Sequence, residues 1–490
     1  MHLLKRNKPE LGQSPLFPLL PPLIAGICLG IEGYPSFLSY IPFFLGALPL
    51  LLIAMHFASR QVSLHPFSHN LIRIYKIACF VCITCLSTLL TLHHLSHPAP
   101  QTHYGIVCEP PVTKQRSTQL VLLLEDGSKL MAYVPKDSFH IGQALYFSKQ
   151  IPSTPSFKEL DGYHQYLKCQ GIYNSTYIPD YICLDSLPFT PTVWESVKLK
   201  AQICRNKLEA ILKHTTLSPQ VKALLSALTL GDKTQLSTQQ KDEFKTAGIS
   251  HLLALSGMHV AFVIALLSFF LPKRWINNTT RKILLVIGTW TFIFIVGLPT
   301  SAVRAGWMIT LVLVNPFPTQ QTSPIDKLAL TAIMLLLYNP LYLYDVGFQM
   351  SFMAVAGLLL SSYILKSRNK FMQLVQCTLV AQIAVLPLTL WHFGQFPTYF
   401  IIANLLLVPI ITPLLIILTF LLLIFQAEWI CQAIKYLVDV QQWVIHLVQQ
   451  LPGNMLFVEN FGVFKMLLCY VVIGLFTYTF TLSNYPKYRG

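Results

Sequence analysis

Few of the residues in this chain are charged. Asp, Glu, Lys and Arg make up 11% of its 490 residues, against roughly 25% in an ordinary soluble domain. Hydrophobic residues make up 53%, and the mean hydropathy is +0.55. A soluble protein of this composition would expose large apolar patches on its surface. The shortage of charge therefore excludes a soluble fold and predicts a membrane protein.

Several short signatures of enzymes and metal sites are also missing. The sequence contains no HExxH, no HxHxDH and no P-loop GxxxxGK[ST]. Its eleven cysteines form no complete zinc-ligand spacing, and the only CxxC pairs, at Cys79, Cys82 and Cys85, lie within an apolar run. Ser256 and His259 lie three residues apart, but no GxSxG elbow accompanies them. We therefore predict no metal, no cofactor and no enzymatic activity.

Apolar runs long enough to cross a bilayer recur along the chain, since a spanning helix needs about 20 mostly apolar residues. They are Ser36–Ala58, Ile249–Leu271, Ile283–Leu298, Tyr344–Leu365, Leu374–Trp391, Tyr399–Phe425 and Val463–Thr481. Further spans are expected at Pro15–Ile31, Ile74–Leu95, Val303–Val314 and Leu328–Tyr338. This arrangement of about ten spans puts the clusters of Lys and Arg on one face, as the positive-inside rule requires.

The net charge of +15 is unevenly placed. The polar segment from Pro98 to Lys200 contains nine basic and nine acidic residues, so the whole excess lies elsewhere. Cytoplasmic loops that follow the positive-inside rule are one explanation. Basic residues that line a path for a polyanion are another, and the sequence leaves both open.

The polar segment His103–Leu184 has the pattern of β-strands. Gln119–Leu124 and Lys129–Val134 flank an Asp-Gly pair, which is a strong hairpin signal. Ala144–Ser148 and Gly171–Ile178 offer further strands. The length fits a small barrel of about five strands, of which an OB-like barrel is one form. If this segment lies outside the cytoplasm, the four cysteines in and beside it can form one or two disulfides. They are Cys108, Cys169, Cys183 and Cys204.

A helix is expected next, over Trp194–Leu212. Its apolar residues form one stripe, and its Lys and Arg lie mostly off that stripe. Such a helix can lie on a membrane surface. It can equally dock on the rest of the protein, and the pattern does not separate the two.

The stretch Leu228–Val260 reads LTLGDKTQLSTQQKDEFKTAGISHLLALSGMHV. Ser237 followed by Gln240 is a capping box, which predicts a short helix that Gly248 ends. Three polar residues, His251, Ser256 and His259, then enter an apolar run and share one flank of a continuous helix. Polar side chains inside a span are costly and face a cavity or a partner. They predict either a polar path or hydrogen bonds that fix helix packing.

This stretch resembles the ComEC family, whose competence domain carries a pattern close to LGD…LS…F…G.SHLLA.SG.H. The matching residues are Gly231, Asp232, Ser237, Phe244, Gly248, His251, Ser256, Gly257 and His259. The resemblance continues at Pro299–Ala305 (PTSAVRA), Asn339-Pro340, Asp345–Phe352 (DVGFQMSF) and Leu386–Pro409. It covers roughly Ser218–Leu415, and Phe157–Tyr173 looks like the family's N-terminal β domain more loosely.

The resemblance implies a channel in a bacterial inner membrane that passes single-stranded DNA into the cytoplasm during natural transformation. The resemblance, together with the presence of polar residues inside apolar spans, predicts that the translocation path is lined by Asp232, Lys233, His251, Ser256, His259 and Arg304. Structural motif roles are expected for Gly231, Gly248, Gly257, Asp345, Gln349 and Asn404. The implied partners are single-stranded DNA, membrane lipid and a separate DNA receptor, ATP-driven motor and nuclease, with a homo-oligomer left open.

The expected organisation has four parts: N-terminal transmembrane helices over 1–97, an extracytoplasmic β domain over 98–190, an amphipathic linker helix over 191–217 and a competence channel domain over 218–484. Many family members continue into a metallo-β-lactamase-like domain with an HxHxDH motif. This chain has no such motif and reaches Gly490 just after a span. We therefore expect another protein to degrade the complementary strand.

Arg304 has two interpretations. A charge at the centre of a span costs at least about 2.5 kcal/mol. Arg304 therefore either contacts DNA phosphates or pairs with Asp345 or Asp232. Three other functions stay open: an intramembrane hydrolase that uses His251, Ser256 and His259, a transporter of another anion, and a family member whose transport has lapsed.

Overall fold

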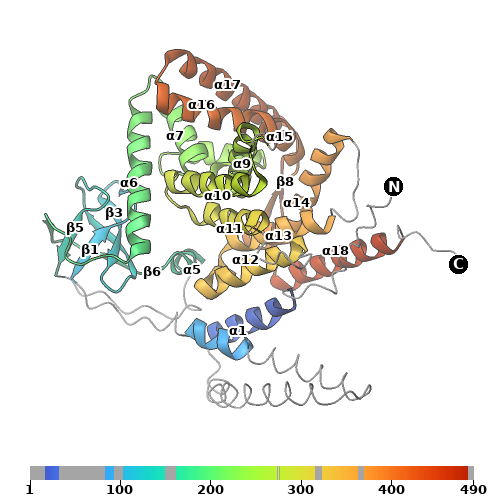
Figure 1. The fold of residues 1–490 in the computed structure, drawn as a ribbon, viewed down its shortest axis with the longest axis horizontal. Helices are drawn as coiled ribbons and strands as arrows, with labels where there is room; N and C mark the ends of the chain where they lie inside the picture. Colours follow the sequence, from blue (N-terminus) through green and yellow to red (C-terminus); the bar gives the residue numbers. More distant parts are fainter. Residues whose placement is uncertain are drawn as a thin grey trace.

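A computed structural model describes residues 17–32, 83–92, 103–148, 162–272, 274, 276–314, 323–361 and 369–483. The described part is mostly helical, with a small β domain at one side and helix α6 (Val193–Lys213) between that domain and the helical body (Figure 1). The span predicted at Ser36–Ala58, the first residues of that at Ile74–Leu95, and Lys366 with Arg368 lie outside the described residues.

Two N-terminal helices pack closely together. They are α1 (Leu20–Glu32), which follows the 3-10 turn η2 (Phe17–Leu19), and an apolar helix over Ile83–Leu92. The Thr88 hydroxyl donates to the carbonyl of Gly26 at 2.9 Å. A Cβ at Gly26 would overlap the Ser87 side chain, so the absence of a side chain there permits the close approach.

The β domain is one seven-stranded sheet of order β6-β4-β3-β1-β5-β7, with β2 paired to β3. The strands are β1 (Tyr104–Val107), β2 (Val112–Thr113), β3 (Ser117–Leu124), β4 (Lys129–Pro135), β5 (Ala144–Phe147), β6 (Ile172–Tyr177) and β7 (Tyr181–Leu184). Neighbouring strands are antiparallel except β4 and β6. Helix α5 (Gly162–Cys169) precedes β6. The sequence pattern predicts about five strands, and the structure adds the short strands β1, β2 and β7 to the four ranges that the pattern offers.

The predicted hairpin is confirmed. Strands β3 and β4 pair from Ser117↔Pro135 to Leu123↔Lys129, and Gly127 at the tip has φ +79°. Only glycine adopts such a conformation without strain. Leucines 120, 122 and 124 are all less than 2% exposed and form the core of the domain.

Helix α6 docks on the helical body. It begins with a capping box in which Thr192 and Glu195 bond reciprocally. Its apolar stripe is buried at Ala201 and Leu212, and the Gln202 amide donates to the Gly297 carbonyl at 2.6 Å. Of the two interpretations of this segment, the structure therefore shows docking.

The helical body continues from there to the end of the described chain. Its first elements are α7 (Pro219–Leu225), η4 (Ser226–Leu230), α8 (Thr238–Thr246), η5 (Ser250–Leu253), α9 (Gly257–Phe270), α10 (Asn278–Ile295), α11 (Thr300–Val314) and α12 (Pro324–Tyr338). The others are η6 (Pro340–Tyr344), α13 (Val346–Ser361), α14 (Lys370–Phe393), β8 (Gln395–Pro397), α15 (Phe400–Leu406), η7 (Leu407–Ile411), α16 (Thr412–Phe425), α17 (Glu428–Gln450), β9 (Met455–Phe457) and α18 (Val463–Ser483).

Two stretches in the described part are long and apolar enough to cross a membrane. They are α14 and the continuous run Phe400–Phe425, which the π-turn η7 interrupts around Pro409. Six shorter apolar helices accompany them. The predicted span at Ile249–Leu271 is not one helix, since only Gly257–Phe270 is α-helical. Fourteen residues rise about 21 Å, less than the roughly 30 Å of a hydrocarbon core.

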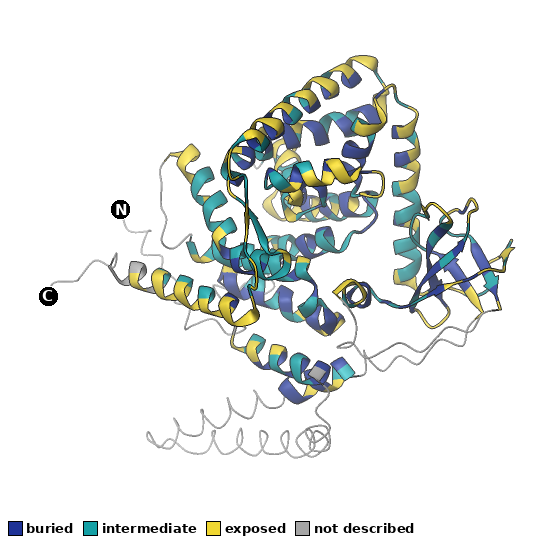
Figure 2. Cartoon of the chain, turned by 180° about the vertical axis from the view of Figure 1, so that it is seen from behind, coloured by how far each residue is buried: buried dark blue, intermediate teal, exposed yellow. Residues whose placement is uncertain are grey.

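Apolar surface covers the outer helices. Figure 2 shows α18 exposed along most of its length, and its exposed residues include Phe464 at 80% and Phe476 at 68%. Exposed apolar faces of this size mark a membrane or protein contact. The apolar helices are consistent with a membrane protein.

A long hairpin that the sequence pattern did not reveal follows α14. Helix α17 packs along α16, and strands β8 and β9 pair at the base of the hairpin, with Phe396 opposite Leu456. The base of this hairpin lies against Gly248, where an added Cβ would come within 2.7 Å of Phe400 Cβ and 3.0 Å of Pro397 Cγ.

Substitution of Gly248 tests this junction. Gly248 has φ +76°, which costs an L-residue roughly 1–2 kcal/mol, and its Cβ would also overlap the hairpin. We expect Gly248→Ala to lower the melting temperature in detergent by several degrees. Gly474→Ala, where nothing lies within 4 Å, is the control. Equal melting temperatures for Gly248→Ala and Gly474→Ala would contradict the close packing of Gly248 against the hairpin.

Candidate functional site

The turn after η4 is built by Gly231 and Asp232. Gly231 ends η4 with φ +76°. Asp232 is 5% exposed, and its carboxylate accepts hydrogen bonds from the Thr234 backbone N–H and hydroxyl, both at 2.9 Å. Asp232 therefore shapes the turn through local bonds. Lys233 next to it is exposed.

A carboxyl group from α6 faces Asp232. Glu209 is 4% exposed and forms an ion pair with Arg205 Nε at 3.2 Å. Burial and the neighbouring Asp232 carboxyl raise the pKa of Glu209 to about 7, against the lowering effect of Arg205 and Lys213. Sequence reasoning missed Glu209, although an Arg and a Glu four residues apart on an amphipathic helix were a usable signal.

The segment with the two histidines is a break between helices. His251 lies in the 3-10 turn η5 and is exposed, Ser256 is the N-cap of α9, and His259 is its third residue. The prediction that all three share one flank of a single helix is therefore wrong. The predicted capping box at Ser237 and the break at Gly248 are confirmed.

The hydrogen bonds of His259 fix which ring nitrogen carries the proton. His259 is 1% exposed, and its Nδ1 lies 3.1 Å from the Ser256 backbone nitrogen and 3.0 Å from Ser256 Oγ. A backbone N–H can only donate, so Nδ1 is an acceptor and a neutral His259 carries its proton on Nε2. That buried Nε2 has no hydrogen-bond partner. It is a donor available to a ligand.

The same geometry argues against the hydrolase as an alternative function. A general base needs a free lone pair toward the nucleophile and an orienting partner on its other nitrogen. Here the Nδ1 lone pair is already directed at the Ser256 N–H, and Nε2 has no orienting carboxylate. Ser256 and His259 form a helix cap whose bonds are all local. No group of three or more His, Cys, Asp or Glu side chains suited to a metal gathers within the described ranges.

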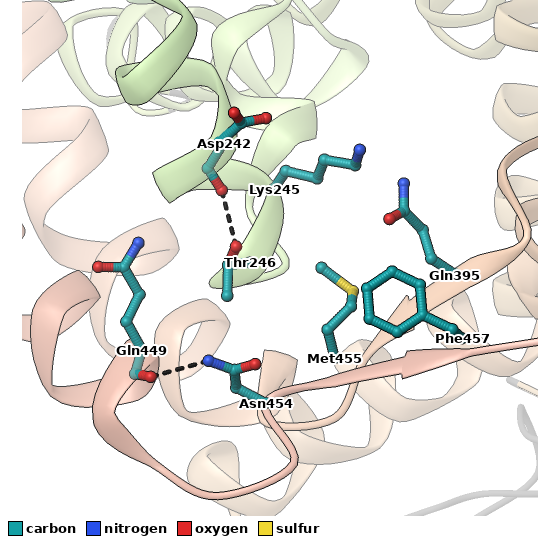
Figure 3. Close-up of a pocket in the computed structure, with 8 residues that line it drawn as sticks. All are labelled: Asp242, Lys245, Thr246, Gln395, Gln449, Asn454, Met455 and Phe457. Carbon is teal, nitrogen blue, oxygen red and sulfur yellow. Dashed lines mark hydrogen bonds between the residues drawn. The ribbon is translucent and has the colours of Figure 1, made fainter.

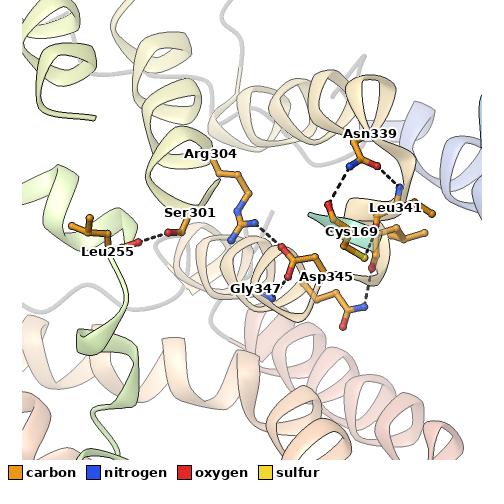
Figure 4. Close-up of polar contacts among 10 residues, drawn as sticks. Cys169, Leu255, Ser301, Arg304, Asn339, Leu341, Asp345 and Gly347 are labelled. Carbon is orange, nitrogen blue, oxygen red and sulfur yellow. Dashed lines mark hydrogen bonds and ion pairs between the residues drawn. The ribbon is translucent and has the colours of Figure 1, made fainter. Parts of the chain in front are cut away.

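Arg304 pairs with Asp345, one of the two partners predicted for it. Arg304 Nη1 lies 2.9 Å from Asp345 Oδ2, and both residues are at least 93% buried (Figure 4). The second carboxylate oxygen of Asp345 accepts the Gly347 N–H at 3.1 Å. The pair joins the start of α11 to the start of α13, and it leaves Arg304 Nε without a partner.

The start of α9 is tied to α11 in the same region. The Ser301 hydroxyl donates to the Leu255 carbonyl, as Figure 4 shows. Two residues further on, a Cβ at Gly257 would meet Ala305 Cβ at 3.4 Å. The histidine segment, the PTSAVRA segment and the DVGFQMSF segment therefore converge at the starts of three helices.

The two remaining predicted polar residues, Gln349 and Asn404, each donate to a backbone carbonyl close to them in the chain. Gln349 donates to the Leu343 carbonyl at 2.8 Å, and its Oε1 lies 2.9 Å from His392 Nε2, a partner that the sequence did not reveal. Asn404 donates to the Phe400 carbonyl at 2.8 Å inside α15. Gln349 thus joins α13 to α14, whereas Asn404 acts within its own helix.

The four cysteines considered for disulfides all carry free thiols. The Cys108 thiol donates to the Val121 carbonyl at 3.3 Å and that of Cys169 to Leu341 at 3.1 Å. Burial raises the pKa of both thiols to about 12, which suppresses the thiolate that disulfide formation needs. None of the four is therefore in a disulfide, and the Cys108 and Cys169 thiols donate hydrogen bonds to backbone carbonyls instead.

Cys169 belongs to a contact between the β domain and the helical body. Its backbone carbonyl accepts from the Asn339 amide at 3.2 Å, and Asn339 Oδ1 accepts from the Leu341 N–H at 3.0 Å (Figure 4). The Asn-Pro pair of the family pattern therefore anchors α5 to η6.

Removal of one partner of the buried ion pair tests its importance. Arg304→Ala leaves the Asp345 charge buried and unpaired, which typically costs about 3–5 kcal/mol. We expect a lower melting temperature in detergent. Arg304→Met combined with Asp345→Asn, which keeps an acceptor for the Gly347 N–H, should recover most of the loss. A single variant as stable as the parent would contradict the pair.

The junction of α6 should respond to pH. The folded pKa of Glu209, about 7, exceeds its ordinary value of 4.5, so the folded state binds more protons between these values. Stability therefore falls as pH rises from about 4.5 to about 7. Glu209→Gln should remove this fall and raise the melting temperature at pH 8 by a few degrees, on the order expected for about 1 kcal/mol. Exposed Glu125→Gln is the control, and identical pH profiles of parent and Glu209→Gln would refute the effect.

Comparison with known proteins places the chain in a family. The model of the family described as Competence protein matches residues 228–482, more than half of the 490 residues. ComE operon protein 3 of Bacillus subtilis is 32% identical over 200 residues, 41% of this chain and 26% of that protein. An uncharacterized protein of Mycoplasma genitalium is 34% identical over 163 residues, 33% of this chain and 42% of that protein.

Recombination protein 2 of Haemophilus influenzae is 26% identical over 178 residues, 34% of this chain and 22% of that protein. The matches thus span less than half the length of these relatives. No solved structure matches the chain. The family match covers the turn at Asp232, both histidines and the ion pair between α11 and α13. This chain belongs to the competence protein family, the ComEC family that its motifs resemble.

Proposed function

We propose that this protein is a multi-pass channel of the bacterial inner membrane that carries one DNA strand into the cytoplasm during transformation. Family membership and the names of two relatives, which refer to the ComE operon and to recombination, support a role in DNA uptake. The observation that carries the proposal is the convergence of three family segments on buried polar groups inside an apolar helical body.

The polar groups suit a path for an anion. Desolvated polar groups are expensive inside a membrane and face a cavity, a partner or a substrate. The Nε2–H of His259 and the Nε–H of Arg304 are buried donors without partners, and donors of this kind bind phosphate oxygens. We assign His251, Ser256, His259 and Arg304 to the path. Asp232 and Lys233 lie at the turn before it.

The β domain has features of a single-strand binder. Tyr104 and Tyr146 pair across β1 and β5 with ring centroids 5.3 Å apart, His103 lies 6.2 Å from Tyr146, and Tyr104 is 39% exposed. Aromatic rings of this kind stack on bases. We propose that this domain is OB-like, because its sheet order and its parallel β4–β6 pair fit a small, partly open barrel. We place it outside the cytoplasm, as the positive-inside rule predicts.

The remaining parts of the proposal follow from the sequence and the family. About ten spans carry the channel, with N-terminal helices over 1–97 and the channel domain over 218–484. A separate receptor, motor and nuclease deliver the strand. Transport of another anion is the alternative that the same buried donors permit, so the test below includes such a substrate.

Uptake of labelled DNA tests the function. Transformable cells that lack their own channel would carry the parent or His259→Ala at matched protein level, with the source organism's motor and nuclease supplied. We expect the parent to restore uptake and His259→Ala to lower it at least tenfold, since the Nε2–H donor is lost. His259→Gln, whose amide reaches close to the position of Nε2, should retain more uptake than His259→Asn.

Three outcomes would overturn parts of the proposal. No uptake with the parent, despite correct insertion, would move the function to another anion, tested with labelled sugar phosphates. Normal uptake by His259→Ala would remove His259 from the path. Peptide or lipid hydrolysis by the purified protein that disappears in Ser256→Ala would favour the hydrolase.

A further inference from the structure

An open cavity of about 410 Å³ lies between α8, the β8–β9 pair and the end of α17. Its size falls within the roughly 300–1,000 Å³ of small-ligand sites. Asp242, Lys245 and Thr246 line it from α8, Gln395 from β8, Gln449 from α17, and residues of β9 complete it (Figure 3). The cavity therefore brings together two family segments that lie about 150 residues apart in the sequence.

Several side chains around the cavity have no partner of their own. Within the described part of the chain, the side chains of Lys245, Gln395 and Gln449 make no hydrogen bond or ion pair. Phe457 is 71% exposed, and Figure 3 shows its ring beside Met455 on the same side as Gln395. The cavity thus offers one ammonium, free amides and an uncovered aromatic ring.

The backbone that carries these side chains is firmly held. The Thr398 hydroxyl and N–H bond to Gly453 and Asn454 carbonyls at 2.8 and 3.0 Å, and the Tyr399 hydroxyl donates to the Pro452 carbonyl at 2.9 Å. The Asn454 amide donates to the Gln449 carbonyl at 2.8 Å. The site is therefore formed before any ligand binds, which lowers the entropic cost of binding.

We infer that this cavity binds a nucleotide of single-stranded DNA, an inference that rests on the function proposed above. The Phe457 ring stacks on a base. The amides of Gln395 and Gln449 each offer donors and an acceptor to the edge of that base, and the Asp242 carboxylate accepts from an exocyclic amino group. The Lys245 ammonium pairs with a phosphate. A duplex hides base edges and faces, so the site selects an unpaired strand.

The test uses the protein in detergent and a fluorescein-labelled oligodeoxycytidylate of fifteen nucleotides, whose bases carry an exocyclic amino group, with binding followed by anisotropy. Stacking on one aromatic ring is worth roughly 1–3 kcal/mol, so Phe457→Ala should weaken binding by roughly 5-fold to 150-fold. Phe457→Tyr keeps the ring and should bind within twofold of the parent. Lys245→Gln should lower the slope of log affinity against log salt by about 0.7.

Phe464→Ala is the matched control, since this ring is 80% exposed on α18 and lies outside the cavity. Melting curves confirm that each variant is folded, and the salt slope of Lys245→Gln is a second readout should Phe457→Ala unfold. If both Phe457→Ala and Lys245→Gln bind the oligonucleotide as the parent does, the nucleotide site is overturned. The proposed function still stands in that case, provided that the parent restores DNA uptake. No binding of the oligonucleotide by the parent would overturn the site, and the uptake assay then decides the function separately.

Discussion

The buried ion pair between Arg304 and Asp345 is the constraint around which the helical body is arranged. Two charges removed from water need each other and further hydrogen bonds, because a lone buried charge costs several kcal/mol. Asp345 meets this requirement by accepting from both Arg304 and the Gly347 N–H. The starts of α11 and α13 are thereby fixed together, and the bond from Ser301 to Leu255 adds the start of α9.

Helices that begin inside the protein create the polar environment. Each helix start exposes backbone N–H groups that an apolar surrounding cannot satisfy. Ser256 and His259 cap α9, and Asn339 supplies the equivalent bond for η6. The same arrangement leaves donors of His259 and Arg304 unused. Polar groups that cap the helices are thus close to buried donors that have no hydrogen-bond partner.

The β domain and the helical body are coupled at two places. Helix α6 docks through Gln202 and brings Glu209 against Asp232. Helix α5 docks through Cys169 on Asn339 and Leu341. These contacts connect α6 to the turn at Asp232 and α5 to η6.

The sequence by itself determined the membrane class, the β3–β4 hairpin, the capping box at Ser237 and the family, because composition, turn residues and motif spacing are local properties. Tertiary structure decided which residues meet. Helical periodicity placed His251 with His259 on one flank, but caps and a 3-10 turn broke that helix. Packing between distant segments decided three contacts. Arg304 pairs with Asp345 rather than with Asp232, Glu209 lies beside Asp232, and Gln395 lies across the cavity from Lys245. No local pattern encodes such contacts, because they follow from how whole helices fit together.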